Sequence, residues 1–173
     1  MAVPVEIDGG EWREPFAAGS ETGLGFDRIP ARGGTVDKEK VIATMNEALR
    51  MELASALKYL DFSFRVFGPT RKPVVEHFLE ESKESFDHAT MLGDKIVALG
   101  GTPVVVAEAP KVPAKAALED ILKMAIKNET AAIDIYTRIL DMVQDETHLR
   151  VLFENQVLAE REHFEELSKM IRR

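Results

Sequence analysis

The sequence of 173 residues contains no cysteine. This absence excludes a disulfide scaffold, a zinc ribbon, an iron site held by thiolates and a thiol nucleophile. It leaves Asp, Glu and the four His residues as the strong metal ligands. The chain also lacks an apolar run near the ~18 residues of a membrane span, and its first residues carry neither the basic nor the apolar block of a signal peptide. We therefore expect a soluble, cytoplasmic protein.

Basic residues are in the minority, because 22 Lys and Arg stand against 30 Asp and Glu, a net charge of −8. Such a charge repels phosphate backbones and draws cations into any acidic cavity. The charge therefore argues against nucleic acid as a partner, and the missing apolar run argues against a membrane.

Glycine and proline are scarce except at the start of the chain. Residues 1–36 hold seven of the eleven glycines and three of the eight prolines, which predicts an extended arm without helix and with little strand. The aromatic residues Trp12, Phe16 and Phe26 suit such an arm to lie against a protein surface. One domain, residues 37–173, follows it.

From Asp37 the apolar residues recur with a period of three to four, as in amphipathic helices. Breaks in this period predict four helices, at residues 37–67, 71–99, 114–144 and 146–172. Two of the links are short, whereas the link at 100–113 is rich in Val and Pro and suits a crossover along a bundle. The predicted fold class is all-α, an antiparallel four-helix bundle with one long crossover.

The inner stripe of each predicted helix is interrupted near its middle by residues that can bind metal. They are Glu52, His88, Glu129, Glu160 and His163. Glu52 and Glu129 are each followed seven residues later by a tyrosine, Tyr59 and Tyr136, and the two segments match at an offset of 77 residues. The chain therefore contains two related helical hairpins.

Taken one at a time, such residues have ordinary explanations: a Glu on a solvated face, or a His satisfied in the core. Four helices that place them at one height do not fit these explanations together. Burying three or four carboxylates without a cation costs several kcal/mol per ion or forces protonation. Two divalent cations offset four glutamates, and the arrangement matches the diiron carboxylate pattern of helical bundles. A polar core or a vestigial site is the alternative.

Residues 37–172 resemble the ferritin-like superfamily and, within it, the bacterioferritin and Dps-like branch. The resemblance rests on Asn46-Glu-Ala-Leu-Arg-Met-Glu52 through Tyr59, on His88 through Leu99-Gly-Gly-Thr-Pro103, on Glu129 and on Glu160-Arg-Glu-His163. It implies that Glu52, Glu129 and Glu160 are carboxylate ligands and that His88 and His163 each cap one iron. It also places Tyr59 beside the metals, where a core aromatic with a hydrogen-bonded hydroxyl is an equal alternative.

The second predicted helix departs from the family, which has Glu three residues before the histidine. Here that residue is Ser85. Glu84, four residues before His88, is the favoured replacement, through a local bulge if one is needed. Glu81, seven residues before it, is the alternative, and Ser85 or water would complete the site if neither glutamate reaches it.

Other family features are missing. The haem-ligating methionine position is Phe86, so haem is not expected, and the first helix has no His for an intersubunit site of the Dps kind. Few residues follow His163, which leaves no fifth helix and favours a dimer or a Dps-like shell, with 12 subunits the expected number. An outer apolar row on the first helix supports a two-fold dimer. It consists of Leu53, Leu57, Leu60 and Phe64.

The function that the resemblance implies is that of a ferroxidase. Two iron ions, with manganese or zinc as possible substitutes, would occupy the site, and Fe(II) would be oxidised by O2 or H2O2 for iron storage or protection from oxidants. Two alternatives remain: a rubrerythrin-like or manganese-containing peroxidase without a mineral, and a Dps-like architectural DNA-binding protein. The acidic composition argues against the second of these.

Overall fold

The computed structural model describes residues 5–7, 11–13, 36–108 and 111–171. The chain divides into two units, 1–30 and 31–173, and each is described by itself. In the first unit, β1 (Val5–Ile7) and β2 (Glu11–Arg13) form an antiparallel pair with Val5 opposite Arg13.

The strand pair occupies six residues of the segment 1–36, for which the sequence predicts an extended arm with little strand. β-branched residues favour strands, and Asp-Gly-Gly follows Ile7 in the sequence, a composition typical of hairpin turns. The expected aromatic anchors Phe16 and Phe26 lie outside the described residues.

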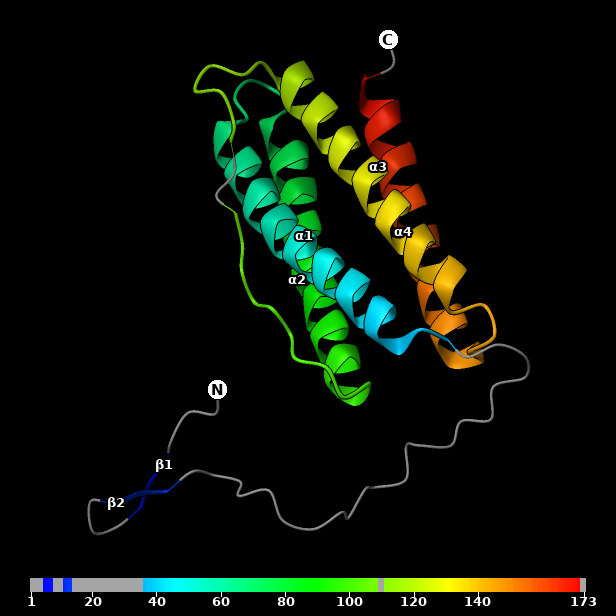
Figure 1. Ribbon diagram of the computed structural model, residues 1–173. Helices are drawn as coiled ribbons and strands as arrows, with labels where there is room; N and C mark the ends of the chain where they lie inside the picture. The colour runs from blue at the N-terminus through cyan, green and yellow to red at the C-terminus, as the bar shows by residue number, and fades with distance from the viewer. Residues whose placement is uncertain (1–4, 8–10, 14–35, 109–110, 172–173) are drawn as a thin grey trace. The chain divides into compact units, whose positions relative to one another are not determined.

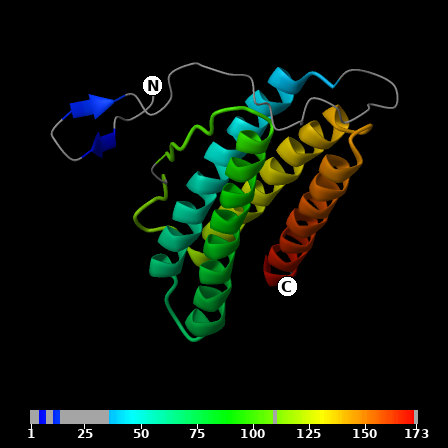
Figure 2. The same ribbon diagram turned by 90° about the horizontal axis from the view of Figure 1, so that it is seen from below.

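The second unit is the predicted antiparallel four-helix bundle (Figure 1). Its helices are α1 (Lys38–Arg65), α2 (Arg71–Ala98), α3 (Leu118–Met142) and α4 (Thr147–Ile171). Figure 2 shows the α1/α2 and α3/α4 hairpins beside each other, and in Figure 1 the link from α2 to α3 follows the length of the first hairpin. No helix among the described residues is long and apolar enough to cross a membrane.

Most helix ends lie close to the predicted ones, but α3 begins at Leu118 instead of residue 114. The preceding residues form a turn in which the Ala116 N–H donates to the Pro113 carbonyl at 3.2 Å. Glu119 and Asp120 then occupy the first turn of α3, where their charge interacts favourably with the positive end of the helix dipole. At the start of α1, the Asp37 side chain accepts a hydrogen bond from the Lys40 N–H.

The crossover is fixed where it leaves α2. Gly100 has φ +80°, the left-handed conformation that favours glycine after a helix. A Cβ on Gly101 would lie 2.7 Å from Ile42 Cγ2, so only glycine permits this close approach to α1. The side chain of Asn46 then donates to the Thr102 carbonyl and accepts from the Val104 N–H.

The apolar core is divided into two clusters along the bundle. On α1, Leu49 belongs to the first cluster and Tyr59 to the second, and Glu52 lies between them. α3 carries the clusters in the reverse order, with Ala125 of the second cluster before Glu129 and Ala132 of the first cluster after it. A polar layer is thus enclosed by two apolar ones, each built from side chains that contribute about 1.5–3 kcal/mol when fully buried.

The two hairpins meet through α1 and α3, whereas the backbones of α2 and α4 stay apart. No Cα atom of α2 lies within 8 Å of a Cα atom of α4, and both helices are wholly described. The space between them must therefore be spanned by side chains, and at mid-height these are the polar side chains described next.

Candidate metal centre

Six side chains that can bind metal converge in the polar layer as two triads. The first is Glu52, His88 and Glu160, and the second is Glu81, Glu129 and His163. Within each triad the potential ligand atoms lie within 4.8 Å of one another. All four helices contribute, and the four carboxylate residues are only 2–6% exposed.

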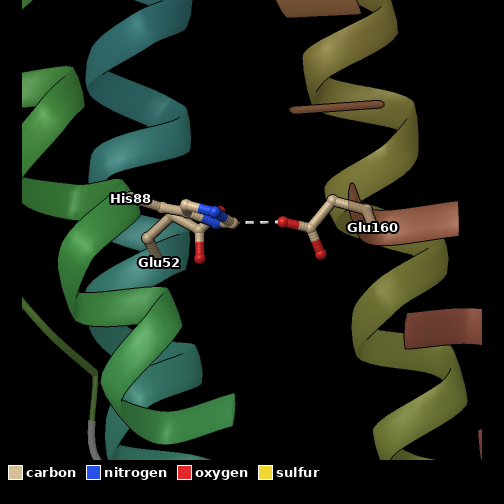
Figure 3. Close-up of side chains that lie close together, drawn as sticks. All are labelled: Glu52, His88 and Glu160. Carbon is tan, nitrogen blue, oxygen red and sulfur yellow. Dashed lines mark ion pairs between the residues drawn. The ribbon is translucent and has the colours of Figure 1, made fainter. Parts of the chain in front are cut away.

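In the first triad, His88 faces two carboxylates (Figure 3). Its Nδ1 lies 3.1 Å from Glu160 Oε1 and 3.6 Å from Glu52 Oε1. Glu52 and His88 lie together, and Glu160 points at them from the opposite side. Neither contact has hydrogen-bond geometry, so the buried Nδ1 has no partner. A cation among these three side chains would satisfy this atom, which is the arrangement expected of a metal site.

The second triad is centred on His163. Its Nδ1 lies 3.3 Å from Glu81 Oε2 and 3.7 Å from Glu129 Oε2. The same nitrogen is 3.8 Å from Glu160 Oε2, while Oε1 of Glu160 faces His88. Glu160 therefore presents one oxygen to each triad, as a carboxylate that bridges two metals does.

Two tyrosines hold the glutamates of α1 and α3 in place by a reciprocal exchange. The Tyr136 hydroxyl of α3 donates to Glu52 Oε1 at 2.5 Å, and the Tyr59 hydroxyl of α1 donates to Glu129 Oε1. Both tyrosines are buried among core residues. The structure thus places Tyr59 one hydrogen bond away from a candidate ligand, with its ring in the apolar core.

On α2 the structure brings Glu81, and not the favoured Glu84, into a triad. The Glu84 side chain is 45% exposed, and its two oxygens lie 3.9 Å from His88 Nε2 and 3.4 Å from His163 Nε2. It therefore lies beside the outward nitrogens of both imidazoles. α2 is a continuous helix without a bulge, in which Glu84 points ~100° away from Ser85 while Glu81 lies about one turn before it.

The carboxylates of the cluster have perturbed pKa values in the absence of cations. Burial raises the pKa of Glu81 to about 7 and, as the largest effect, that of Glu129 to about 8. Burial also raises the pKa of Glu52. At Glu160 burial acts in the same direction, but the nearby imidazoles of His163 and His88 outweigh it and lower the pKa to about 2.

The two histidines, in contrast, are held in their charged forms. Burial disfavours their charged forms, but the surrounding carboxylates outweigh it and raise the pKa of His88 to about 10 and that of His163 to about 11. Without metal, two imidazolium groups thus supply the positive charge that the buried carboxylates require. A divalent cation in each triad would replace these protons.

The sequence does not predict two neighbours of the second triad. His77 Nδ1 lies 3.6 Å from Glu81 Oε1. The feature of the sequence that could have indicated this contact is the spacing of four residues, which places both side chains on one face of a helix. Lys58 donates to Asn128 at 2.5 Å, and Asn128 donates to Ser55, which fastens α1 to α3 beside the cluster. Nothing in the helical period distinguishes this lysine from a solvated one.

The chain belongs to the ferritin-like family, because the model of the ferritin-like domain matches residues 42–173. No curated protein gives a significant sequence match. Solved structures support the family and the fold. A ferritin-like, diiron-carboxylate protein from Bacillus anthracis is 26% identical, with a TM-score of 0.74, and the match covers 80% of this chain and 100% of that one.

Two further structures are similar. The bacterioferritin of Rhodobacter capsulatus, described with a metal-free dinuclear site and haem iron, is 25% identical, with a TM-score of 0.68 over 77% of this chain and 84% of that one. A dodecameric thioferritin from Bacteroides fragilis shares the fold at 24% identity, with a TM-score of 0.71 and coverage of 78% and 85%. The buried Glu/His clusters of the present chain are consistent with a dinuclear metal site in this family.

Proposed function

We propose that this protein is a ferroxidase that binds two Fe(II) ions in the two triads and oxidises them with O2 or H2O2. The oxidation would serve iron storage or the removal of oxidant. The ligands in this proposal are Glu52, Glu81, His88, Glu129, Glu160 and His163, with Glu84 beside both histidines.

The position of Glu160 is the observation that carries the proposal. Its two oxygens face the imidazoles of different triads, at 3.1 and 3.8 Å. A shared carboxylate places two cations side by side, which a pair of unrelated sites would not do. Four buried glutamates also supply the charge that two divalent cations neutralise, and the unpartnered Nδ1 of His88 is free to ligate.

Bound Fe(II) supplies the electrons of the reaction as its substrate, one from each ion. Two electrons and two protons convert O2 to H2O2, or H2O2 to two waters. The chain contributes a fixed set of carboxylates, which favours the higher charge of Fe(III) over that of Fe(II). Tyr59 and Tyr136 hold Glu129 and Glu52 through hydrogen bonds, and the apolar clusters on both sides limit access of water.

Iron is the proposed metal, and manganese or zinc could occupy the same oxygen and nitrogen ligands. Haem is not part of the proposal. The residue at the position of the family's haem ligand is Phe86, which is exposed on α2 and has no atom that can ligate iron.

We further propose that the chain forms a homo-oligomer built from a dimer through the outer face of α1. Leu57, Leu60 and Phe64 of the predicted apolar row are exposed there, and Phe86 of α2 is exposed as well. A two-fold dimer would cover such a face with a second copy. The dodecameric state of the Bacteroides fragilis protein supports a shell of 12 subunits as the full assembly.

Stopped-flow absorbance after anaerobic loading with Fe(II) tests the activity. We expect Glu52→Ala and His163→Ala to abolish rapid oxidation with either oxidant while helicity is retained. Glu47→Ala and His148→Ala are matched controls on the same two helices, because Glu47 pairs with Arg138 at the surface and His148 is exposed. Oxidation at the wild-type rate in either ligand variant would exclude this site as the ferroxidase centre.

Native mass and metal content, measured on protein grown with ample iron, separate storage from the peroxidase alternative. A heavy shell loaded with many irons per chain supports storage. A dimer that holds two metals per chain and turns over H2O2 without accumulating iron indicates a peroxidase.

A further inference from the structure

His77 is a partly buried histidine next to the cluster, and the proposed set of ferroxidase ligands gives it no role. Its side chain is 16% exposed, and its Nε2 is fully buried without a hydrogen-bond partner. It lies four residues before Glu81 on α2, so both side chains project from the same face of that helix. Because Nε2 has no partner, Nδ1 is the ring nitrogen through which His77 contacts a neighbouring polar side chain.

The two oxygens of Glu81 divide their contacts between two imidazoles. Oε2 lies 3.3 Å from His163 Nδ1, inside the second triad, and Oε1 lies 3.6 Å from His77 Nδ1, away from it. His77 therefore approaches the oxygen that faces away from the metal position. Its place is that of a residue that orients a ligand, not of a ligand.

Glu81 needs such a partner more than the other carboxylates do. The hairpin repeat places Ser85 where the equivalent residue of α4 is Glu160, so α2 has no carboxylate at the repeated position. Glu81 reaches the cluster from about one turn away along the helix. Glu52 and Glu129 are each held by a tyrosine hydroxyl, and no tyrosine contacts Glu81 within the described residues.

The geometry points to His77 as the positioning residue that allows Glu81 to serve as a metal ligand in place of the missing carboxylate at position 85. An Nδ1–H on His77 donates toward Glu81 Oε1 and leaves Oε2 directed at the second metal position. The present separation is longer than a hydrogen bond and would have to shorten for this donation to form, as it does for ligating carboxylates, which are themselves hydrogen-bonded. This inference rests on the proposed dinuclear site.

Titration with Co(II) tests it, because cobalt binds oxygen and nitrogen ligands and its absorption reports each binding step without turnover. His77→Phe keeps a ring against Phe78, whose centroid is 5.8 Å away, and removes both nitrogens. His77→Asn places an amide N–H where Nδ1 lies and preserves the donor. His148→Phe is the matched control, an exposed histidine replaced on α4.

We expect the wild type and His148→Phe to bind two Co(II) per chain. His77→Phe keeps the first Co(II) at wild-type affinity and binds the second about 10- to 100-fold more weakly, as measured for outer partners of metal ligands. His77→Asn restores most of the second affinity, which a purely packing role for the ring would not predict.

Two results would overturn the inference while leaving the dinuclear site intact. In the first, His77→Phe binds each of the two Co(II) ions with the same affinity as the wild type. In the second, His77→Phe and His77→Asn lose affinity for the second Co(II) to the same extent. A wild-type chain that binds fewer than two Co(II) instead overturns the proposed site, and this inference with it.

Discussion

Removing the charge of Glu81 is expected to stabilise the metal-free protein while impairing metal binding. The folded chain holds the Glu81 proton more tightly than the unfolded chain, because burial raises its pKa from 4.5 to about 7. Ionising Glu81 therefore costs free energy in the folded state. At about 1.4 kcal/mol per pH unit, the cost is about 3 kcal/mol once the pH exceeds 7.

The sign of the pH dependence follows from linkage. Below pH 4.5 the carboxyl is protonated in both states and costs nothing, and the cost grows as the pH rises from 4.5 to 7. At pH 5 it is less than ~1 kcal/mol. Glu81→Gln, which is neutral at every pH, is therefore expected to raise the free energy of unfolding at pH 8 by about 3 kcal/mol and at pH 5 by much less. For a chain of this size that corresponds to roughly 10 °C in Tm at pH 8.

Thermal and urea unfolding of chelator-treated protein, at one fixed protein concentration, measures this effect. Glu84→Gln is the matched control on the same helix, and its half-exposed side chain is expected to change stability by less than about 0.5 kcal/mol. Adding Co(II) reverses the order, because the wild type gains more from metal than a variant with one charged ligand fewer. A Glu81→Gln protein that is less stable than wild type without metal, or equally shifted at pH 5 and pH 8, would refute this account of the buried charge.

Three further predictions concern metal uptake, nucleic acid and the N-terminal segment. Co(II) affinity is expected to rise at least about tenfold per pH unit between pH 6 and 8, because each metal displaces a proton from His88 or His163, whose pKa values are raised to about 10 and 11, and the second also displaces protons from Glu81 and Glu129; a flat dependence in equilibrium dialysis would contradict this. A gel shift with duplex DNA at physiological salt is expected to show no complex, given the net charge of −8, and a retained shift would reveal a basic patch. Deleting residues 1–36 is expected to lower the number of subunits in the assembly or the Tm while both metals still bind, whereas an unchanged subunit number and melting curve would mean that the segment is a passive tail.

The fold could be predicted because the helical period, the turn residues and the length of one link all agree. In helices of 25–28 residues the apolar period repeats many times, so one residue that departs from it does not change the prediction of a helix. The start of α3 could not be placed as well. The alanines and the lysine at 114–117 are as compatible with a helix as with the turn that they form. The start of α3 is decided instead by Pro113, whose carbonyl accepts the hydrogen bond of the turn, and by the acidic residues of the first helical turn.

The candidate site could likewise be predicted from the sequence only in part. Glu52 and Glu129 interrupt apolar stripes, and the repeat at 77 residues pairs them, so their positions on facing helices follow from the sequence. The choice on α2 does not follow from it. Glu81 and Glu84 both lie near the required face, and the outcome depends on the regularity of the helix and on which rotamer reaches across the space between α2 and α4.

The departure at Ser85 makes the two triads unequal, although the hairpins that form them are related by an internal repeat. The pairs that obey the repeat occupy equivalent positions: the two buried glutamates of α1 and α3, their tyrosines and the two histidines. Glu160 has no counterpart at position 85, so among the described residues it is the one buried carboxylate that faces both triads. The second position relies instead on Glu81, which carries a pKa raised by burial and a histidine on its far oxygen. The second triad contains two carboxylates whose pKa burial raises, Glu81 and Glu129, whereas the first contains only Glu52. Because more protons must leave the second triad when metal binds, the first triad is expected to fill before the second.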